Sequence, residues 1–274
     1  IIGAGYIGME LGTISHKLGS DVTILEAERQ ILPHFNRRMV TPISRKAKKM
    51  DLEVKTNQMV SDLEKEDDEV ILSTDDGEEF SADKCLISVG RVPVTDGLNL
   101  DETDVTVDED GFIEVNDKGL TEDSNIYAIG DVVGGKMLAH KAYNEASVAV
   151  DSIVGRDNEK SSVPEVVFTD PQLAKIGEFE DYNVGRASFR GVGAAYTKNK
   201  AEGTLRIAVD DDGVIKGGQI VGPEASEIIH EIAVAVENEL TVDDIVGTLH
   251  AHPTVSEGIV LAAEDAMDLP SSSI

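Results

Sequence analysis

The sequence is poor in basic residues. Its 274 residues contain 24 Lys and Arg against 53 Asp and Glu, which leaves a net charge of −29. A nucleic-acid backbone would be repelled by such a chain, and no basic stripe compensates, so nucleic-acid binding is excluded as the default function. Hydrophobic residues make up 41% of the sequence, so the acidity belongs to a folded surface. Because ions must screen this surface, we expect a halophilic source; an ordinary acidic protein is the alternative.

Cysteine pairs, membrane-length apolar runs and an initiating Met are also lacking. Cys85 is the single cysteine, so no intramolecular disulfide can form, and it is most simply a small buried hydrophobic residue. No run of 18 apolar residues and no signal peptide occurs, which predicts a cytoplasmic protein with no membrane partner. The first residues, Ile1-Ile2-Gly3, read as the inside of a buried strand. We therefore expect the chain to be a fragment of a longer protein.

A glycine turn near the start predicts dinucleotide binding. Gly3-x-Gly5-x-x-Gly8 follows a predicted strand and opens a predicted helix, and Glu26 ends the next strand. Gly3 permits the tight turn, Gly5 lets the backbone approach a pyrophosphate, and Gly8 allows close helix packing, while the helix N-terminus attracts phosphate. Glu26 would accept hydrogen bonds from ribose hydroxyls and repel a 2′-phosphate, which favours NAD over NADP.

Further along the chain, the pattern predicts the remaining elements. Residues 36–50 carry a basic island on a predicted helix, most simply a solvated helix face. Residues 52–86 alternate apolar and acidic residues, as short antiparallel strands do. The region after residue 162 combines strands with three helices, which predicts an α+β domain. One apolar stripe at helical spacing predicts a helix packed on a sheet: Ile7, Leu11, Ile14 and Leu18.

A second strand end also carries an acidic side chain. Asp131 follows Gly130 there, and Leu138-Ala139-His140 begins a predicted helix just beyond. A carboxylate can hold a sugar hydroxyl, and free N–H groups at a helix start can hold a phosphate or carbonyl oxygen. Taken alone, Gly-Asp is more often only a common turn.

A histidine and a glutamate occur together near the C-terminus. His252 precedes Pro253 in a loop, and Glu257 stands in the first turn of the helix that follows. Histidine exchanges protons near neutral pH, and a nearby carboxylate can orient its ring and stabilise imidazolium. The residues alone leave a structural helix cap as an equal alternative. The sequence predicts no metal site.

These motifs occur in an order that is typical of one family. The chain resembles the flavoprotein pyridine nucleotide–disulfide oxidoreductases over essentially its whole length, and most closely their dihydrolipoamide dehydrogenase branch. The residues that carry the resemblance are Gly3 to Gly8 with Glu10 and Glu26, Val89-Gly90-Arg91-Val92-Pro93, Ile129-Gly130-Asp131, Met137 to Ala142, Phe168-Thr169-Asp170-Pro171, and His250 to Glu257.

The resemblance implies the fold class and the domains. The fold would be α/β, with a Rossmann-type NAD domain in residues 1–92 and the second half of an FAD-binding domain in residues 93–160. An α+β dimerisation domain would follow in residues 161–274. FAD and NAD would be the cofactors, and a homodimer the working form.

It also implies roles for individual residues. His252, oriented by Glu257, would take a proton from a dithiol in the active site of the other subunit. The cofactor contacts would be Gly3, Gly5, Gly8 and Glu26 on NAD, Glu10 beside the nicotinamide path, Gly90 behind the nicotinamide, Asp131 on the ribityl chain of FAD, and the helix start at Leu138, Ala139 and His140 facing the flavin ring.

The implied reaction is the oxidation of dihydrolipoamide, which the lipoyl domain of a 2-oxoacid dehydrogenase complex would carry. The electrons would pass through a redox disulfide to FAD, and a hydride would then be transferred to NAD. The first glycine motif for FAD and the cysteine pair are missing from the sequence, so we expect these residues alone to be inactive. Two alternatives stay open: another NAD-linked disulfide or quinone oxidoreductase of the family, and a non-catalytic NAD-binding dimerisation module.

Overall fold

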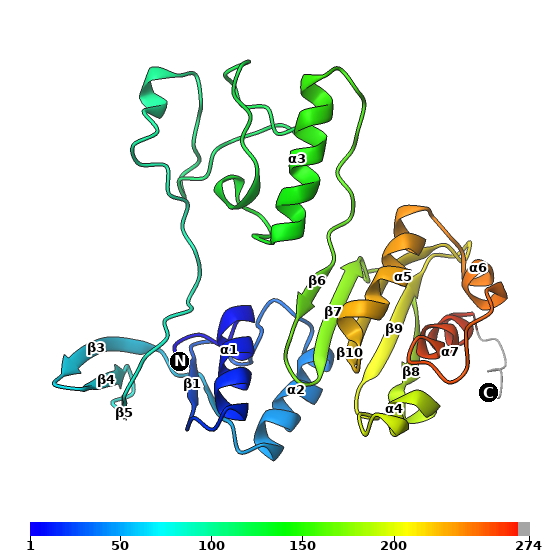
Figure 1. The fold of residues 1–274 in the computed structure, drawn as a ribbon, viewed down its shortest axis with the longest axis horizontal. Coiled ribbons are helices and arrows are strands. Elements are labelled where there is room, and N and C mark those ends of the chain that lie inside the picture. Colours follow the sequence, from blue (N-terminus) through cyan, green and yellow to red (C-terminus); the bar gives the residue numbers. More distant parts are fainter. Residues whose placement is uncertain (268–274) are drawn as a thin grey trace. The chain divides into compact units, whose positions relative to one another are not determined.

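The computed structural model describes residues 1–267 as two compact units (Figure 1). The first unit combines residues 1–89 with those from 164 onward, and the second unit is residues 90–163. Most of the range expected for the NAD domain (1–92) and most of that expected for the dimerisation domain (161–274) thus share one unit, whereas residues 90–92 and 161–163 belong to the other. None of the helices within residues 1–267 has the length and hydrophobicity needed to cross a bilayer.

A small parallel sheet opens the first unit. Strand β1 (Thr23–Glu26) pairs in parallel with β2 (Glu53–Thr56), and Ile2 forms parallel bridges to Leu25 and to Ile87. Helix α1 (Tyr6–Lys17) joins the first bridge to β1, and α2 (Arg37–Lys49) joins β1 to β2. This is the predicted strand–turn–helix–strand arrangement.

Helix α1 packs on this sheet with the face that carries Gly8 and Gly12 and not with its apolar stripe. Gly8, Met9, Gly12 and Thr13 are buried. A Cβ at Gly12 would lie 2.6 Å from Cδ1 of Ile24, so the helix approaches the strand too closely for a larger side chain. The predicted packing face was therefore wrong. Its members are exposed, from 40% at Ile7 to 82% at Leu18: Ile7, Leu11, Ile14 and Leu18.

An antiparallel three-stranded sheet follows. It contains β3 (Val60–Glu66), β4 (Glu69–Thr74) and β5 (Glu79–Ala82) in sequence order. The turn between β4 and β5 contains Gly77 at a φ of +84°. The prediction of antiparallel strands is confirmed for this sheet but wrong for β2, which pairs in parallel with β1. Cys85 is only partly buried, so the expectation of a buried residue was also wrong.

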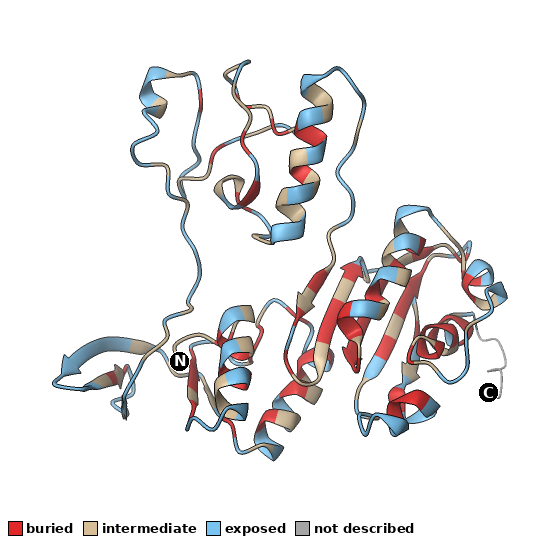
Figure 2. Cartoon of the chain, in the orientation of Figure 1, coloured by how far each residue is buried: buried red, intermediate tan, exposed pale blue. Residues whose placement is uncertain are grey.

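The second half of the first unit is built on a five-stranded antiparallel sheet of order β6-β7-β10-β9-β8. Helix α5 packs on β7 and β10, and α7 packs on β8 and β9. The opposite face carries Val167, Leu173 and Val221, which join the apolar cluster of α1 and α2. Buried residues accordingly run along the central strands and α5 (Figure 2). The bounds are β6 Glu165–Val167, β7 Gln172–Gly177, β8 Asn183–Ser188, η3 Phe189–Gly191, α4 Gly193–Thr197, β9 Thr204–Val209, β10 Ile215–Gly222, α5 Ala225–Glu237, α6 Val242–Gly247 and α7 Glu257–Ala266.

The second unit has little regular structure. A small apolar cluster of Val105, Ile113 and Ala128 lies at its centre. Its elements are η1 Leu100–Glu102, η2 Gly130–Val133 and α3 Ala139–Ile153. The predicted fold class, an α/β nucleotide-binding part followed by an α+β part, is confirmed.

Candidate functional site

The glycine turn joins the first parallel bridge to α1. Gly3 has a φ of +95°, and a Cβ there would lie 2.5 Å from the carbonyl oxygen of Ser88. A Cβ at Gly8 would lie 1.9 Å from the carbonyl oxygen of Gly3. The fold itself therefore requires both glycines. Gly5 differs, because no atom of residues 1–267 other than those of Gly5 and its two chain neighbours lies within 4 Å of the place its Cβ would take. The open space beside Gly5 leaves room for a pyrophosphate against the backbone.

Glu26 ends β1 and faces this turn. Its carboxylate accepts hydrogen bonds from the backbone N–H of Ala4 at 2.6 Å and of Glu28 at 2.9 Å, and the residue is 7% exposed. Each carboxylate oxygen keeps a further lone pair for a ribose hydroxyl. Helix α1 begins after Gly5, and no side chain in the described part of the chain caps its first N–H groups. The turn, the helix start and the acidic residue come together as predicted and fit the adenosine diphosphate half of NAD.

Glu10 lies further along α1 and is bound to the loop before β7. Its Oε1 atom accepts a hydrogen bond of 2.9 Å from the backbone N–H of Phe168. Burial raises the pKa of Glu10 above its ordinary value, and the hydrogen bond from Phe168 opposes the rise only in part. Glu10 therefore lies on the helix that follows the glycine turn. Within residues 1–267, no hydrogen bond joins Glu10 to Glu26.

Tyr6, within the glycine turn, was not predicted as a site residue. Its hydroxyl donates a hydrogen bond of 2.5 Å to Oε2 of Glu165, whose Oε1 lies 3.1 Å from Nζ of Lys175. Burial, together with the Glu165 carboxylate, raises the pKa of Tyr6, so the phenol stays protonated. Tyr6 and Glu165 are 159 positions apart, so no local pattern in the sequence signals this contact.

In the second unit, the Gly-Asp turn forms the start of η2. Gly130 has a φ of +79° and donates its N–H to Oε2 of Glu145 at 2.9 Å. Glu145 is 5% exposed and also pairs with Lys141 at 2.9 Å. Asp131, the predicted sugar-binding residue, forms an ion pair of 2.5 Å with Arg91. The sequence did not predict either Glu145 or the Arg91 pair, because the partners lie 15 and 40 positions away.

The predicted flavin-facing residues stand at the start of α3. Leu138 is the N-cap, Ala139 is the first helical residue and His140 follows. No described side chain caps this helix start, so its first N–H groups are available to an oxygen atom of a ligand. Helix α3 packs against η2, which brings the helix start and the Gly-Asp turn into one region.

Gly90 stands at the boundary between the units at a φ of +134°, which only glycine adopts readily.

His252 and Glu257 form the predicted pair. The Nδ1 atom of His252 lies 2.8 Å from Oε1 of Glu257, and Oε2 of Glu257 accepts from the N–H of Thr254 at 2.8 Å. Burial by itself would raise the pKa of Glu257, but these hydrogen bonds and the nearby histidines lower it below its ordinary value. Because an ionised carboxylate only accepts, Nδ1 must carry the proton, which leaves the Nε2 lone pair of His252 as the basic atom.

The imidazole of His252 is accessible. Its side chain is 62% exposed, whereas Glu257 is buried. No hydrogen bond to Nε2 is made by any residue in the described range. A cavity of about 220 Å³ adjoins the pair, and its lining is Arg190, Gly191, Val192, Gly193, Tyr196, His252, Glu257 and Leu261. A small thiol-bearing substrate could therefore reach Nε2 from this side.

His250 stands two residues before His252 and was not assigned a role from the sequence. Its Nε2 and Nδ1 atoms contact Glu231 on α5 and the backbone of Thr248. No group of three or more His, Cys, Asp or Glu side chains in residues 1–267 has the arrangement of a metal site.

Two family models match the chain. The model described as pyridine nucleotide–disulphide oxidoreductase matches residues 1–146, and the model described as the dimerisation domain of the same family matches residues 163–263. Together they include the glycine turn, the Gly-Asp turn and the His252–Glu257 pair.

Three similar curated relatives are named dihydrolipoyl dehydrogenase. The chain is 39% identical to a dihydrolipoyl dehydrogenase of Haloferax volcanii and 39% identical to one of Halobacterium salinarum, in each case over 97% of this chain. It is 40% identical to a dihydrolipoyl dehydrogenase of Geobacillus stearothermophilus over 98% of this chain. The two haloarchaeal relatives agree with the halophilic character expected from the charge. The chain spans 60% of the length of each of these relatives.

Solved structures give the same fold. LpdA from Mycobacterium tuberculosis matches 96% of this chain with a TM-score of 0.91 at 26% identity, and the match covers 60% of that structure's chain. The HOCl-induced flavoprotein disulfide reductase RclA of Escherichia coli matches 98% of this chain with a TM-score of 0.85 at 25% identity, covering 63% of its chain.

Proposed function

The chain belongs to the pyridine nucleotide–disulphide oxidoreductase family, and we propose that it supplies the NAD-binding and proton-transferring part of a dihydrolipoyl dehydrogenase. Residues 1–92 would bind NAD, residues 93–160 would complete an FAD domain, and residues 161–274 would form the dimer interface. The complete enzyme would oxidise dihydrolipoamide and reduce NAD.

The His252–Glu257 pair carries this proposal. Dihydrolipoamide oxidation needs a base that takes a proton from a thiol, because the thiolate and not the thiol attacks a disulfide. Nε2 of His252 is the basic atom, and the buried Glu257 carboxylate, 2.8 Å from Nδ1, fixes the tautomer and stabilises the imidazolium that forms. A family member that handles no dithiol has less need of this arrangement.

The cofactor contacts follow from the residues described above. The open space at Gly5, the start of α1 and the Glu26 carboxylate fit the pyrophosphate and ribose of NAD, and the charge of Glu26 disfavours a 2′-phosphate. Asp131 and the start of α3 fit the ribityl and ring portions of FAD. When bound, FAD and NAD supply the electron and hydride transfer chemistry, while this chain binds them, orients them and moves a proton at His252.

The partners would be a second copy of the chain and a lipoyl group. The match to a dimerisation-domain model supports the homodimer, in which His252 would serve the active site of the other subunit. Leu249, directly before the histidine loop, is 98% exposed, as expected for an apolar residue that a partner covers. The lipoyl group would be carried by a 2-oxoacid dehydrogenase complex.

The thiol chemistry needs cysteines that are not among these residues. The sequence contains one cysteine, and a single thiol cannot cycle between dithiol and disulfide. The 274 residues by themselves should therefore not oxidise dihydrolipoamide, and the activity is expected of a protein that also carries a cysteine pair and the rest of the FAD domain.

The test is the variant His252→Gln in the full-length protein. Dihydrolipoamide-dependent reduction of NAD should fall by about 10²–10⁴-fold, while flavin reduction by NADH should be retained, because only the first reaction needs the base. His230→Gln, on the exposed face of α5, is the matched control and should leave both reactions unchanged.

Equal loss of both reactions in His252→Gln would mean that His252 supports the fold and is not the base. No turnover of dihydrolipoamide by the unsubstituted full-length protein would instead favour another disulfide or quinone as the substrate. Finding that the protein binds NAD and dimerises but holds no flavin would favour the non-catalytic module.

A further inference from the structure

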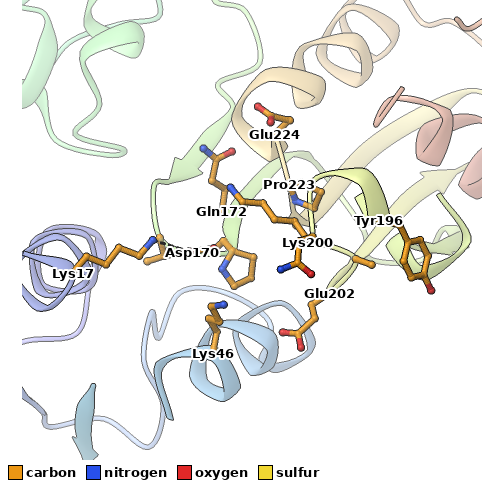
Figure 3. A pocket seen from close by; sticks show the side chains of 14 residues that line it. Lys17, Lys46, Asp170, Gln172, Tyr196, Lys200, Glu202, Pro223 and Glu224 are labelled. Carbon is orange, nitrogen blue, oxygen red and sulfur yellow. Dashed lines mark hydrogen bonds and ion pairs between the residues drawn. The ribbon is translucent and has the colours of Figure 1, made fainter. Parts of the chain in front are cut away.

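A second cavity in the first unit has no part in the reaction proposed above. Its volume is about 490 Å³, and its lining shares only Tyr196 with the cavity beside His252. It lies where the ends of α1 and α2 meet the loops that precede β7, β9 and α5 (Figure 3). Neither the glycine turn nor the Gly-Asp turn contributes to it.

Ammonium groups gather at this cavity. Lys17, at the end of α1, forms an ion pair of 2.6 Å with Asp170. Lys46 on α2 and Lys200 before β9 also line the space, and neither has an ion-pair partner among residues 1–267. Figure 3 shows the three side chains arriving from separate elements of the fold. Three lysines therefore lie around the carboxylate of Asp170.

The positive charge of these lysines helps to lower the pKa of two carboxylates at the cavity, Asp170 and Glu202. Burial by itself would raise the pKa of Asp170, but the ion pair with Lys17 and the charges of Lys46 and Lys200 lower it. The hydrogen bond from Lys49 lowers the pKa of Glu202, and the charge of Lys46 adds to the effect. Lys46 thus acts on two acidic groups at once without pairing with either.

The ion pairs on the rim leave an excess of positive charge. Lys49 pairs with Glu202, and Lys198 pairs with Glu224 at 3.1 Å. Counting Lys17 with Asp170 as well, each of the three carboxylates already has its own lysine, so Lys46 and Lys200 add two uncompensated charges.

Such a concentration of positive charge is unusual in this chain. Its net charge is −29, and it has only 24 basic residues. The sequence pattern predicted a solvated helix face for the basic island at residues 36–50, yet Lys46 is partly buried and lines the cavity. Amide groups of Gln172 and Asn199 also line it and can donate hydrogen bonds to oxygen.

We propose that this cavity binds a multivalent oxyanion of the diphosphate class, with Lys46 and Lys200 as its two principal ligands. The two unpaired ammonium groups match the charge of linked phosphoryl groups, and the cavity is large enough to hold both. A bound diphosphate would connect α2 to the loop before β9. It would therefore stabilise the packing of residues 1–89 against the rest of the first unit.

The test is calorimetric titration of inorganic pyrophosphate into the full-length protein, at the lowest KCl concentration at which the protein stays folded. Pyrophosphate should bind in a saturable manner and raise the midpoint of thermal unfolding. The double variant Lys46→Gln/Lys200→Gln should weaken the affinity by about tenfold or more. The matched control is Lys65→Gln/Lys84→Gln, which removes the same charge from exposed positions and should bind as tightly as the unsubstituted protein.

Three results would overturn the proposal: no saturable binding, equal weakening in both double variants, or sulfate binding as tightly as pyrophosphate. A free diphosphate and a diphosphate-bearing nucleotide share the same chemistry, and titration with ADP separates them. ADP that binds more tightly than pyrophosphate in the unsubstituted protein, and loses that affinity in Lys46→Gln/Lys200→Gln, would assign the site to nucleotides. NADH-driven flavin reduction should stay unchanged in both double variants.

Discussion

The Nε2 atom of His250 lies 2.7 Å from a carboxylate oxygen of Glu231, and its Nδ1 atom lies 2.9 Å from the carbonyl oxygen of Thr248. Neither oxygen can donate a hydrogen bond, so both ring nitrogens can be satisfied only when both carry protons. The geometry therefore selects the imidazolium form. The charged imidazole of His250, through its hydrogen bond to Glu231, links the loop that carries His252 to α5.

This pair predicts a pH-dependent contribution to stability. Burial would lower the pKa of His250, but the hydrogen bonds to Glu231 and Thr248 raise it above its ordinary value. The contribution should be fully present below a pH of about 6.5, the unfolded value, and should disappear as the pH rises through the folded pKa. In urea unfolding of the full-length protein, Glu231→Gln should cost on the order of 1 kcal/mol at low pH and less at high pH. A loss that does not vary with pH, as expected for the control Glu227→Gln, would contradict this account.

Glu257 should fix the tautomer of His252. Its lowered pKa keeps the carboxylate ionised through the neutral range, where it can only accept the proton on Nδ1. Glu257→Gln offers Nδ1 a neutral amide in place of the carboxylate, so kcat/KM for dihydrolipoamide in the full-length protein should fall by about 10–100-fold. An unchanged kcat/KM would show that the carboxylate does not hold the ring.

Glu26 should govern the choice of nucleotide. Glu26→Gln keeps an oxygen for the N–H of Ala4 but removes the charge that faces a 2′-phosphate. The preference for NAD over NADP, measured as the ratio of kcat/KM values, should fall by about tenfold or more, because like charges in contact are strongly unfavourable. Glu28→Gln removes the same charge from an exposed neighbour and should leave the ratio unchanged. An unchanged ratio in Glu26→Gln would refute the role.

Two glycines of one turn should behave differently. Gly8→Ala places a Cβ 1.9 Å from the carbonyl oxygen of Gly3 and should destabilise the fold by about 1–3 kcal/mol or more. Apart from its two chain neighbours, the new Cβ of Gly5→Ala meets no atom of the described chain within 4 Å, so the variant should keep stability within about 1 kcal/mol while weakening NAD binding. Urea unfolding and NAD titration separate the two effects. Unaltered NAD affinity in Gly5→Ala would show that the space beside Gly5 is not the pyrophosphate site.

The acidic surface should make stability depend on salt. With 53 acidic and 24 basic residues, the folded chain repels itself unless ions screen it. The thermal unfolding midpoint of the full-length protein should rise steeply between about 0.1 M and 1 M KCl, over which the Debye length falls from about 10 Å to about 3 Å. An unfolding midpoint that is equal in dilute buffer would argue against a halophilic adaptation.

Partners that lie close in the sequence could be predicted from it. The glycine turn and Glu26 belong to one strand–helix–strand unit, and His252 and Glu257 are five positions apart, so residue type and spacing were enough. Contacts between distant segments left no such signal. Tyr6 meets Glu165 only because the five-stranded sheet packs against α1 and α2, and Lys46 and Lys200 line one cavity for the same reason.

The sequence pattern predicted helix α1 correctly but predicted the wrong buried face for it. Hydrophobic spacing identifies an apolar face, but the sheet accepts the side of the helix that allows the shortest approach. Gly8 and Gly12 provide that side, because a Cβ at either would overlap with the neighbouring chain. Glycines four positions apart in a helix that follows a strand were the better indicator of the buried face.

The hydrogen bonds from Ala4 and Glu28 to Glu26 have a consequence for the kinetics of nucleotide association. The carboxylate is already immobilised by the backbone before any ligand arrives, so its rotational entropy is lost during folding and not during the encounter. Recognition at this position needs no slow rearrangement. Stopped-flow traces of NAD binding should accordingly show a single phase whose rate rises in proportion to nucleotide concentration, without the plateau that a preceding conformational step would impose.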